Sequence, residues 1–216
     1  MKTQFRHILE ELQQHLPYTI FSVAVGMMAL GALTVLIEGN KFPQASQNLF
    51  HIFHPLHVLF SATATTAMFW RHDKKILKAV SIGFAGAVSL CAISDIFIPF
   101  VAGYLLGVKM HLHICIVADP MIVLPFAFFG IFMGFVLPMA VESTVFSHAA
   151  HILISSMASI FYLVSFGLTE WIPVVGMVFI YMVLAVMIPC CTSDIIFPLL
   201  LVKRAVKEGH TSKGPS

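Results

Sequence analysis

The sequence predicts an all-α integral membrane protein whose six transmembrane helices form two inverted three-helix repeats. Broken helices are expected between Asp95 and Pro99 and between Asp194 and Pro198. Three observations predict this fold: the chain contains long apolar runs, its polar motifs occur twice in the same order, and its basic residues concentrate on alternate loops.

The composition is that of a chain that lies in a bilayer. Hydrophobic residues make up 59% of the sequence, charged residues only 10%, and the mean hydropathy is +0.94. A soluble domain of 216 residues could not hide that much apolar surface. Because a spanning helix needs about 20 apolar residues, we expect six spans, at residues 16–37, 55–70, 76–98, 121–141, 145–168 and 174–202.

Basic residues are unevenly distributed between the two sets of loops. With six spans, one side holds ten of them, namely Lys2, Arg6, Arg71, Lys74, Lys75, Lys78, Lys203, Arg204, Lys207 and Lys213. The other side holds Lys41 and Lys109. Since cytoplasmic loops are enriched in lysine and arginine, both termini are expected in the cytoplasm.

The expected units follow from the spans and from the first residues. Phe5, Ile8, Leu9 and Leu12 follow a spacing of three and four residues, which is typical of an amphipathic helix on the membrane surface. We therefore expect this interfacial helix at residues 1–15 and a first repeat at residues 16–108. An outer loop follows at residues 109–120, then a second repeat at residues 121–203 and a cytoplasmic tail at residues 204–216. Residues 100–108 are expected to form a short broken or re-entrant segment.

The duplication covers one segment in each of three spans. The first match pairs Leu16, Pro17 and Gly26 with Leu124, Pro125 and Gly134. The second match pairs His54, His57, Ser61 and Thr65 with His148, His151, Ser155 and Ser159. The third match pairs Cys91, Ser94, Asp95 and Pro99 with Cys190, Ser193, Asp194 and Pro198. Because three is odd, the second unit enters the membrane from the opposite face. This is the inverted-repeat architecture of secondary transporters.

The two aspartates are the most unusual residues of the spans. In each copy a proline follows four residues after the aspartate and lacks the N–H that would bond the aspartate's carbonyl, so we expect the helix to break there. The freed backbone oxygen, the carboxylate and the neighbouring serine hydroxyl, from Ser94 or Ser193, together suit a cation site. The alternative is a pair of structural aspartates that accept hydrogen bonds from neighbouring helices.

The histidine pairs lie on one helix stripe with small hydroxyl residues. Two imidazoles on one face bind a shared metal ion, and small residues let another helix approach closely. Interfacial or helix-bridging hydrogen bonds are the alternative. The candidate ligands are therefore His54, His57, Asp95, His148, His151 and Asp194. They form either two sites in series or one shared site.

Further candidates surround these ligands. Glu38 and Glu142 end the first and fourth spans, where each either adds a carboxylate ligand or is an ordinary solvated residue. Cys91 and Cys190 lie four residues before the aspartates, and each is either a soft ligand or a small packing group. Ser61 and Ser155 lie on the histidine stripes. In the outer loop, His111 and His113 alternate with apolar residues. They either bind a metal ion before it enters the membrane, together with His51, or have no role in metal binding.

Several chemistries are excluded by missing motifs. The chain lacks a glycine-rich phosphate loop, a basic patch interleaved with aromatics and a Gly-x-Ser-x-Gly elbow, which argues against ATP use, nucleic-acid binding and serine-nucleophile chemistry. The expected partners are the bilayer, a metal ion and protons, and a homo-oligomer is left open.

Two functions of different class remain. The first is a proton-coupled transporter, not an enzyme, for a divalent transition metal; nitrogen and oxygen ligands suit Zn, Mn, Fe, Co or Ni. The second is a haem-binding or quinone-reactive redox protein that uses the same histidines as axial ligands. Haem does not explain the duplicated aspartate phrase, and a membrane-embedded enzyme with a metal-activated water is a weaker third interpretation.

Overall fold

The structure is a computed structural model that describes residues 2–37, 39, 41–136 and 145–191. The side chains of residues 2–12, 14, 72, 145–148, 190 and 191 lie outside this description. Within it the chain is helical, with elements in the order α1 (Lys2–Leu36), α2 (Lys41–His72), α3 (Ile76–Ala92), η1 (Ile93–Phe97), α4 (Ile98–Leu105), α5 (Cys115–Ala118), α6 (Pro120–Val136), α7 (Val145–Ser165), η2 (Ile172–Val174) and α8 (Val175–Cys191).

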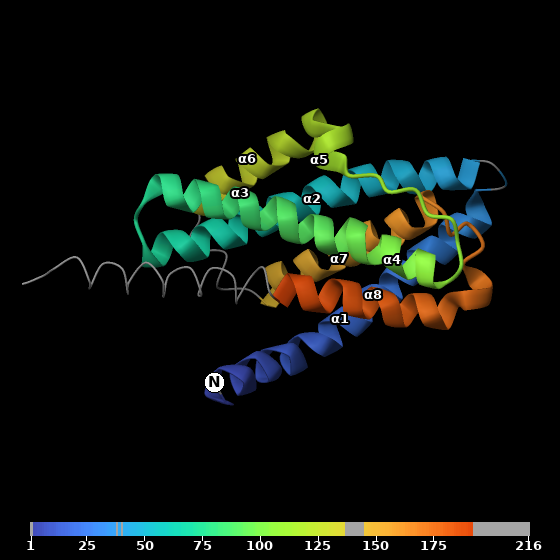
Figure 1. The fold of residues 1–216 in the computed structure, drawn as a ribbon, viewed down its shortest axis with the longest axis horizontal. Coiled ribbons are helices and arrows are strands. Elements are labelled where there is room, and N and C mark those ends of the chain that lie inside the picture. The colour runs from blue at the N-terminus through green and yellow to red at the C-terminus, as the bar shows by residue number, and fades with distance from the viewer. Residues whose placement is uncertain (1, 38, 40, 137–144, 192–216) are drawn as a thin grey trace, which may run out of the picture.

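The long helices run back and forth between two ends of an elongated bundle (Figure 1). Three helical stretches are long and apolar enough to cross a membrane, His15–Leu36, Ile76–Leu105 and Ile172–Pro189, and they fit a membrane protein. The other apolar helices, Pro120–Val136 and Ala149–Ser165, are shorter in the part of the chain that the structure describes. The expected span at residues 55–70 lies inside α2.

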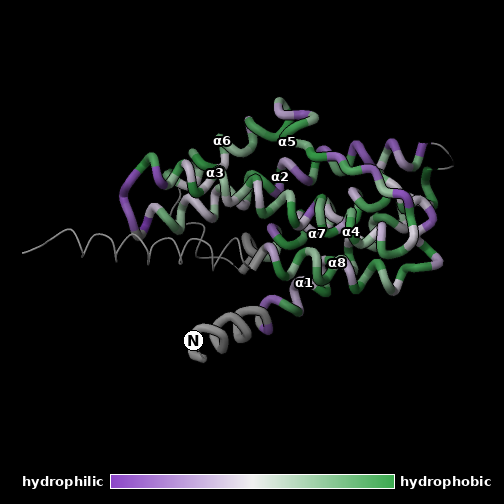
Figure 2. The backbone as a smooth tube through the Cα atoms, viewed as in Figure 1, coloured by the Kyte–Doolittle hydropathy of each residue, from purple (hydrophilic) through white to green (hydrophobic). Residues whose placement is uncertain are grey.

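The outside of the bundle is apolar, as lipid contact requires. Val35, Leu77 and Met121 are each at least 80% exposed. Figure 2 shows hydrophobic colour along most of the helices and hydrophilic colour at the connection between α2 and α3. Large hydrophobic side chains facing outward on several helices fit the same membrane assignment.

Helix α2 lies at the centre and packs against α3, α6 and α7, while α7 packs against α1 and α8. The approach of α6 to α2 is close because Gly130 has no side chain: a Cβ there would collide with the carbonyl of Leu59 and with Ala62. This packing buries polar residues of α2 together with apolar ones, including His54, His57 and Ser61.

The first expected helix break is wrong in form, because the helix widens there and does not end. Residues Ile93–Phe97 form a π-helix between α3 and α4, and the N–H of Ile98 donates to the carbonyl of Ile93, five residues earlier. In that register the missing N–H of Pro99 would have bonded the carbonyl of Ser94. The Ser159 hydroxyl of α7 lies 3.2 Å from this oxygen, and 2.8 Å from the carbonyl of Ser155.

The structure also describes two other segments for which the sequence analysis made predictions. Residues 98–105 continue the helix as α4, so the expected re-entrant segment is a helix followed by a turn. The expected interfacial helix is the first part of α1, which is continuous through Pro17. Figure 1 shows this part of α1 projecting beyond the bundle, and its place on a membrane surface stays a prediction. The second break, between Asp194 and Pro198, lies outside the described residues.

Candidate functional site

The buried carboxylate of Asp95 is the centre of the candidate site. Asp95 lies on the π-helix and is 0% exposed. The Ser94 hydroxyl donates to Oδ1 of Asp95 over 2.6 Å, a shorter contact than its 3.1 Å to the carbonyl of Cys91. A π-helix adds one residue to the turn and changes which side chains face the neighbouring helices, so the insertion determines where this carboxylate points.

Two histidines of α2 contact the other carboxylate oxygen. His54 Nδ1 lies 2.9 Å and His57 Nδ1 lies 2.7 Å from Oδ2 of Asp95. Both imidazoles are 2% exposed. Their spacing of three residues places them on one face of α2, one turn apart, which lets both reach the same oxygen.

Helix α7 brings the second sequence copy to the same carboxylate. The Ser155 hydroxyl donates to Oδ1 of Asp95 over 3.3 Å. The ring of His151 lies 4.8 Å from that of His57, centroid to centroid, at an interplanar angle of 54°. Residues of both copies therefore share one location, which we name the Asp95 cluster: Asp95, His54, His57, His151, Ser94 and Ser155.

The hydrogen-bond pattern determines what the Asp95 cluster offers to a ligand. When the carboxylate is ionised it accepts hydrogen bonds, so both Nδ1 atoms carry the proton. Each neutral imidazole then has its lone pair on Nε2. A carboxylate that orients a histidine through Nδ1–H and leaves Nε2 for a metal is a recurrent arrangement at metal sites. Asp95 thus contacts the histidines through their Nδ1 atoms.

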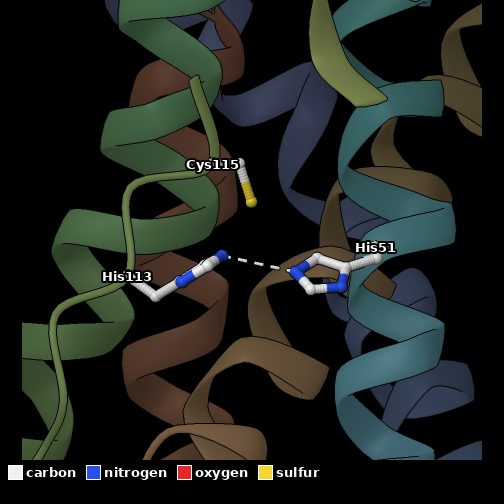
Figure 3. Close-up of side chains that lie close together, drawn as sticks. All are labelled: His51, His113 and Cys115. Carbon is white, nitrogen blue, oxygen red and sulfur yellow. Dashed lines mark hydrogen bonds between the residues drawn. The ribbon is translucent and has the colours of Figure 1, made fainter. Parts of the chain in front are cut away.

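A second group lies near the start of α2, and we name it the outer cluster: His51, His113, Cys115 and Asp119. The ligand atoms of the first three lie within 4.8 Å of one another. Figure 3 shows the rings of His51 and His113 facing each other, with Cys115 beside them. Their Nε2 atoms are 3.3 Å apart, and Asp119 Oδ2 lies 3.3 Å from Nε2 of His113 and 3.9 Å from Nε2 of His51.

Burial and neighbouring charges shift the titration of two groups in the outer cluster. Desolvation, followed by the nearby His113, lowers the pKa of His51, although Asp119 opposes this effect. Desolvation is also the main reason that the pKa of the Cys115 thiol is raised to about 12, with Asp119 and Asp95 adding to the shift. Without a cation, the structure therefore favours a neutral His51 and a protonated Cys115.

The structure describes the side chains of some of the remaining candidate residues and not of others. Ser61 and Cys91 are buried near the Asp95 cluster on α2 and α3. His111 is exposed and lies outside the three-residue group, while its backbone N–H donates to the carbonyl of Phe166. The others lie outside the described side chains: Glu38, Glu142, His148, Cys190, Ser193 and Asp194.

Asp119 is the residue that the sequence reasoning missed. It follows Cys115 by four residues, and its N–H donates to the carbonyl of Cys115 across the short helix α5. That spacing, just before Pro120, is the available signal that the two side chains face the same way.

The chain has no match among known protein families, curated proteins or solved structures. Its function is therefore argued from its own residues.

Proposed function

We propose that this protein is a proton-coupled secondary transporter for a divalent transition-metal cation, which binds at the Asp95 cluster. The observation that carries the proposal is the meeting of both sequence copies at one buried carboxylate, through His54 and His57 from α2 and Ser155 from α7. Ionisable residues inside apolar helices are costly to insert, and where they occur they mark paths of ions and protons.

Helix packing supports the inverted-repeat part of the proposal. An axis that exchanges the two units would pair α1 with α6, α2 with α7, and the α3–α4 stretch with α8. Three contacts of the first unit then have counterparts: α2 packs on α6 as α7 does on α1, α2 on α3 as α7 on α8, and α1 on α8 as α3 on α6. Helices α2 and α7 pack on each other, which fits a position at the axis.

The proposed topology has six spans with both termini in the cytoplasm. It is supported by the alternation of helix direction in Figure 1, in which the start of α1 and the α2–α3 connection lie at one end. The connection from α4 to α5, which contains Lys109, lies at the other end. The basic residues Arg71, Lys74 and Lys75 are at the first end, as the positive-inside rule requires for a cytoplasmic face.

The ligand chemistry favours transition metals over hard cations. Imidazole nitrogen suits Zn, Fe, Co and Ni, whereas Mg and Ca prefer shells made of oxygen alone. The proposed ligands are Nε2 of His54 and of His57, with His151 beside them, and Asp95 holds the rings and balances the charge of the ion. One shared site between the two repeats is the reading that this contact pattern supports.

Proton exchange follows from the same ligands. A metal binds only to deprotonated imidazole, so binding releases protons and protonation releases the metal. The buried carboxylate and imidazoles then carry either a metal or protons, and a pH gradient drives the cation across the bilayer.

A flux assay tests the proposed function. Purified protein in proteoliposomes that contain a metal-sensitive dye is offered Zn, Mn, Fe, Co and Ni in turn, with and without a pH gradient. We expect at least one metal to cross, with protons moving in the opposite direction. Folded, correctly inserted protein that moves none of the five would contradict the proposal.

A further inference from the structure

Two of the distances in the outer cluster match the spacing of ligands around a tetrahedral metal ion. A tetrahedral zinc ion at ~2.0 to 2.1 Å from two imidazole nitrogens separates them by about 3.3 to 3.4 Å. The Nε2 atoms of His51 and His113 are 3.3 Å apart, and Oδ2 of Asp119 lies the same 3.3 Å from the second of them. The ligand atoms of His51, His113 and Cys115 lie within 4.8 Å of one another, and Oδ2 of Asp119 lies 3.9 Å from Nε2 of His51.

A simple imidazole–imidazole hydrogen bond explains less of this arrangement. Such a bond needs one protonated and one unprotonated nitrogen and no further group. Here a carboxylate and a cysteine also converge on the pair, although the four residues come from α2, the outer loop and α5. Convergence of two nitrogens, a sulfur and an oxygen from separate segments is the ligand set of zinc-class ions.

The outer loop is held firmly enough to keep this geometry. The Tyr162 hydroxyl accepts the backbone N–H of His113 and donates to the carbonyl of His111. The His113 ring stacks on Phe166, with centroids 4.8 Å apart and an interplanar angle of 10°. Met110 also packs closely on two glycines, since a Cβ at either Gly103 or Gly167 would meet its sulfur unless that side chain moved.

The two clusters follow one another along α2. His51 and His54 are one helical turn apart, so their Cα atoms differ by about 4.5 Å along the axis. The ring of Phe50 stacks on that of His54 at 5.3 Å and meets His113 edge-on at 6.5 Å. His51 and His113 are partly exposed, whereas His54 is 2% exposed. An ion at the outer cluster is thus between solvent and the buried site.

We propose that His51, His113, Cys115 and Asp119 form a metal-binding site for zinc-class ions that loads the Asp95 cluster. The loading role rests on the proposed transport function, whereas the binding itself does not. A thiolate ligand favours Zn or Co over Mn and excludes Mg, because soft sulfur suits borderline cations. The site therefore selects the class of cation that reaches the path.

Cobalt binding to the full chain in detergent tests the site. Tetrahedral Co²⁺ with a thiolate ligand gives visible bands and a sulfur-to-metal band in the near ultraviolet. We expect Cys115→Ser to remove the sulfur-to-metal band. We expect His113→Gln to weaken Co²⁺ and Zn²⁺ binding at least about tenfold, because even the loss of a residue that only hydrogen-bonds to a metal ligand has an effect of that size. The matched controls, Cys91→Ser and His111→Gln, should leave both unchanged.

The result separates this site from the proposed function. Asp95→Asn should keep the Cys115-dependent band while flux is lost. A band with no flux in the unmodified protein would leave the site standing and contradict transport. Flux without any band that depends on Cys115, or equal Mn and Zn affinity, would overturn the outer site and leave the transport proposal intact.

Discussion

The hydroxyl of Ser155 lies 3.3 Å from Oδ1 of Asp95, which joins α7 to the π-helix between α3 and α4. The residue next to it, Ser156, donates instead to the carbonyl of Ile152 within its own helix. Both serines are fully buried on one helix, and they form a matched pair for substitution.

We expect Ser155→Ala to destabilise the protein more than Ser156→Ala. A hydrogen bond to a charged group contributes about 1.5 to 3 kcal/mol, more than the roughly 1 kcal/mol of a bond between neutral groups. Thermal unfolding in detergent measures the difference. Equal melting temperatures for the two variants would show that the Ser155 contact contributes no more than the local hydrogen bond of Ser156.

The topology predicts opposite accessibility for two loop positions. Residue 73 lies in the connection between α2 and α3, and residue 109 lies in the outer loop. Single cysteines placed there in intact cells should react with a membrane-impermeant reagent only at position 109. Labelling of both positions from the same side would contradict the six-span topology and the inversion of the second repeat.

The ligand set predicts a protein without haem. His54 and His57 direct their Nδ1 atoms to one carboxylate oxygen, and their rings lie in a packed interior with Phe50 stacked on His54. Absorption of the protein purified from haem-supplied cells should show no Soret band. A Soret band that disappears on replacing His57 or His151 would establish the redox interpretation instead.

Metal binding at the Asp95 cluster should weaken in acid. Free imidazole titrates near pH ~6.5, and only its neutral form binds metal. Affinity should therefore decrease as the pH falls, by up to about tenfold per pH unit for each imidazole ligand that becomes protonated. Zinc titration at several pH values of a variant that carries both Cys115→Ser and His113→Gln reduces the contribution of the outer cluster. Affinity that is constant between about pH 7.5 and 5.5 would exclude histidine ligands.

Sequence patterns predicted the helical, membrane-type fold and part of the site. The three-residue spacing of His54 and His57 correctly indicates a shared face of α2, because helix geometry alone decides it. The duplication also brought attention to Ser155 and His151, which the structure places with Asp95. How the two copies meet depends on helix tilt and on side-chain packing, and the repeat pattern contains neither.

The backbone at Asp95 was harder to predict from sequence. Proline chemistry correctly indicates an irregularity, but a break and a π-helix both relieve the clash at Pro99, and the proline pattern does not distinguish them. The hydroxyl of Ser159, which is 65 residues further along the chain, lies 3.2 Å from the carbonyl of Ser94. Asp119 was missed for a similar reason, since its partners His51 and His113 come from two other segments.

The effect of Asp95→Asn on metal flux tests the central claim most directly. Asparagine keeps the size of the side chain and one carbonyl acceptor, but it removes the charge that orients both imidazoles. The matched control is Asp73→Asn, which removes a carboxylate paired with Lys75 at 3.8 Å in the α2–α3 connection. His57→Gln provides a second variant that retains the Asp95 carboxylate.

The three variants and the unmodified protein are compared in proteoliposomes after elution as single folded species in size-exclusion chromatography. We predict that Asp95→Asn and His57→Gln lose metal flux, with at least about a tenfold decrease, while Asp73→Asn transports at the rate of the unmodified protein. Unchanged flux in folded Asp95→Asn and His57→Gln would contradict the account and leave the Asp95 cluster a structural contact between two repeats.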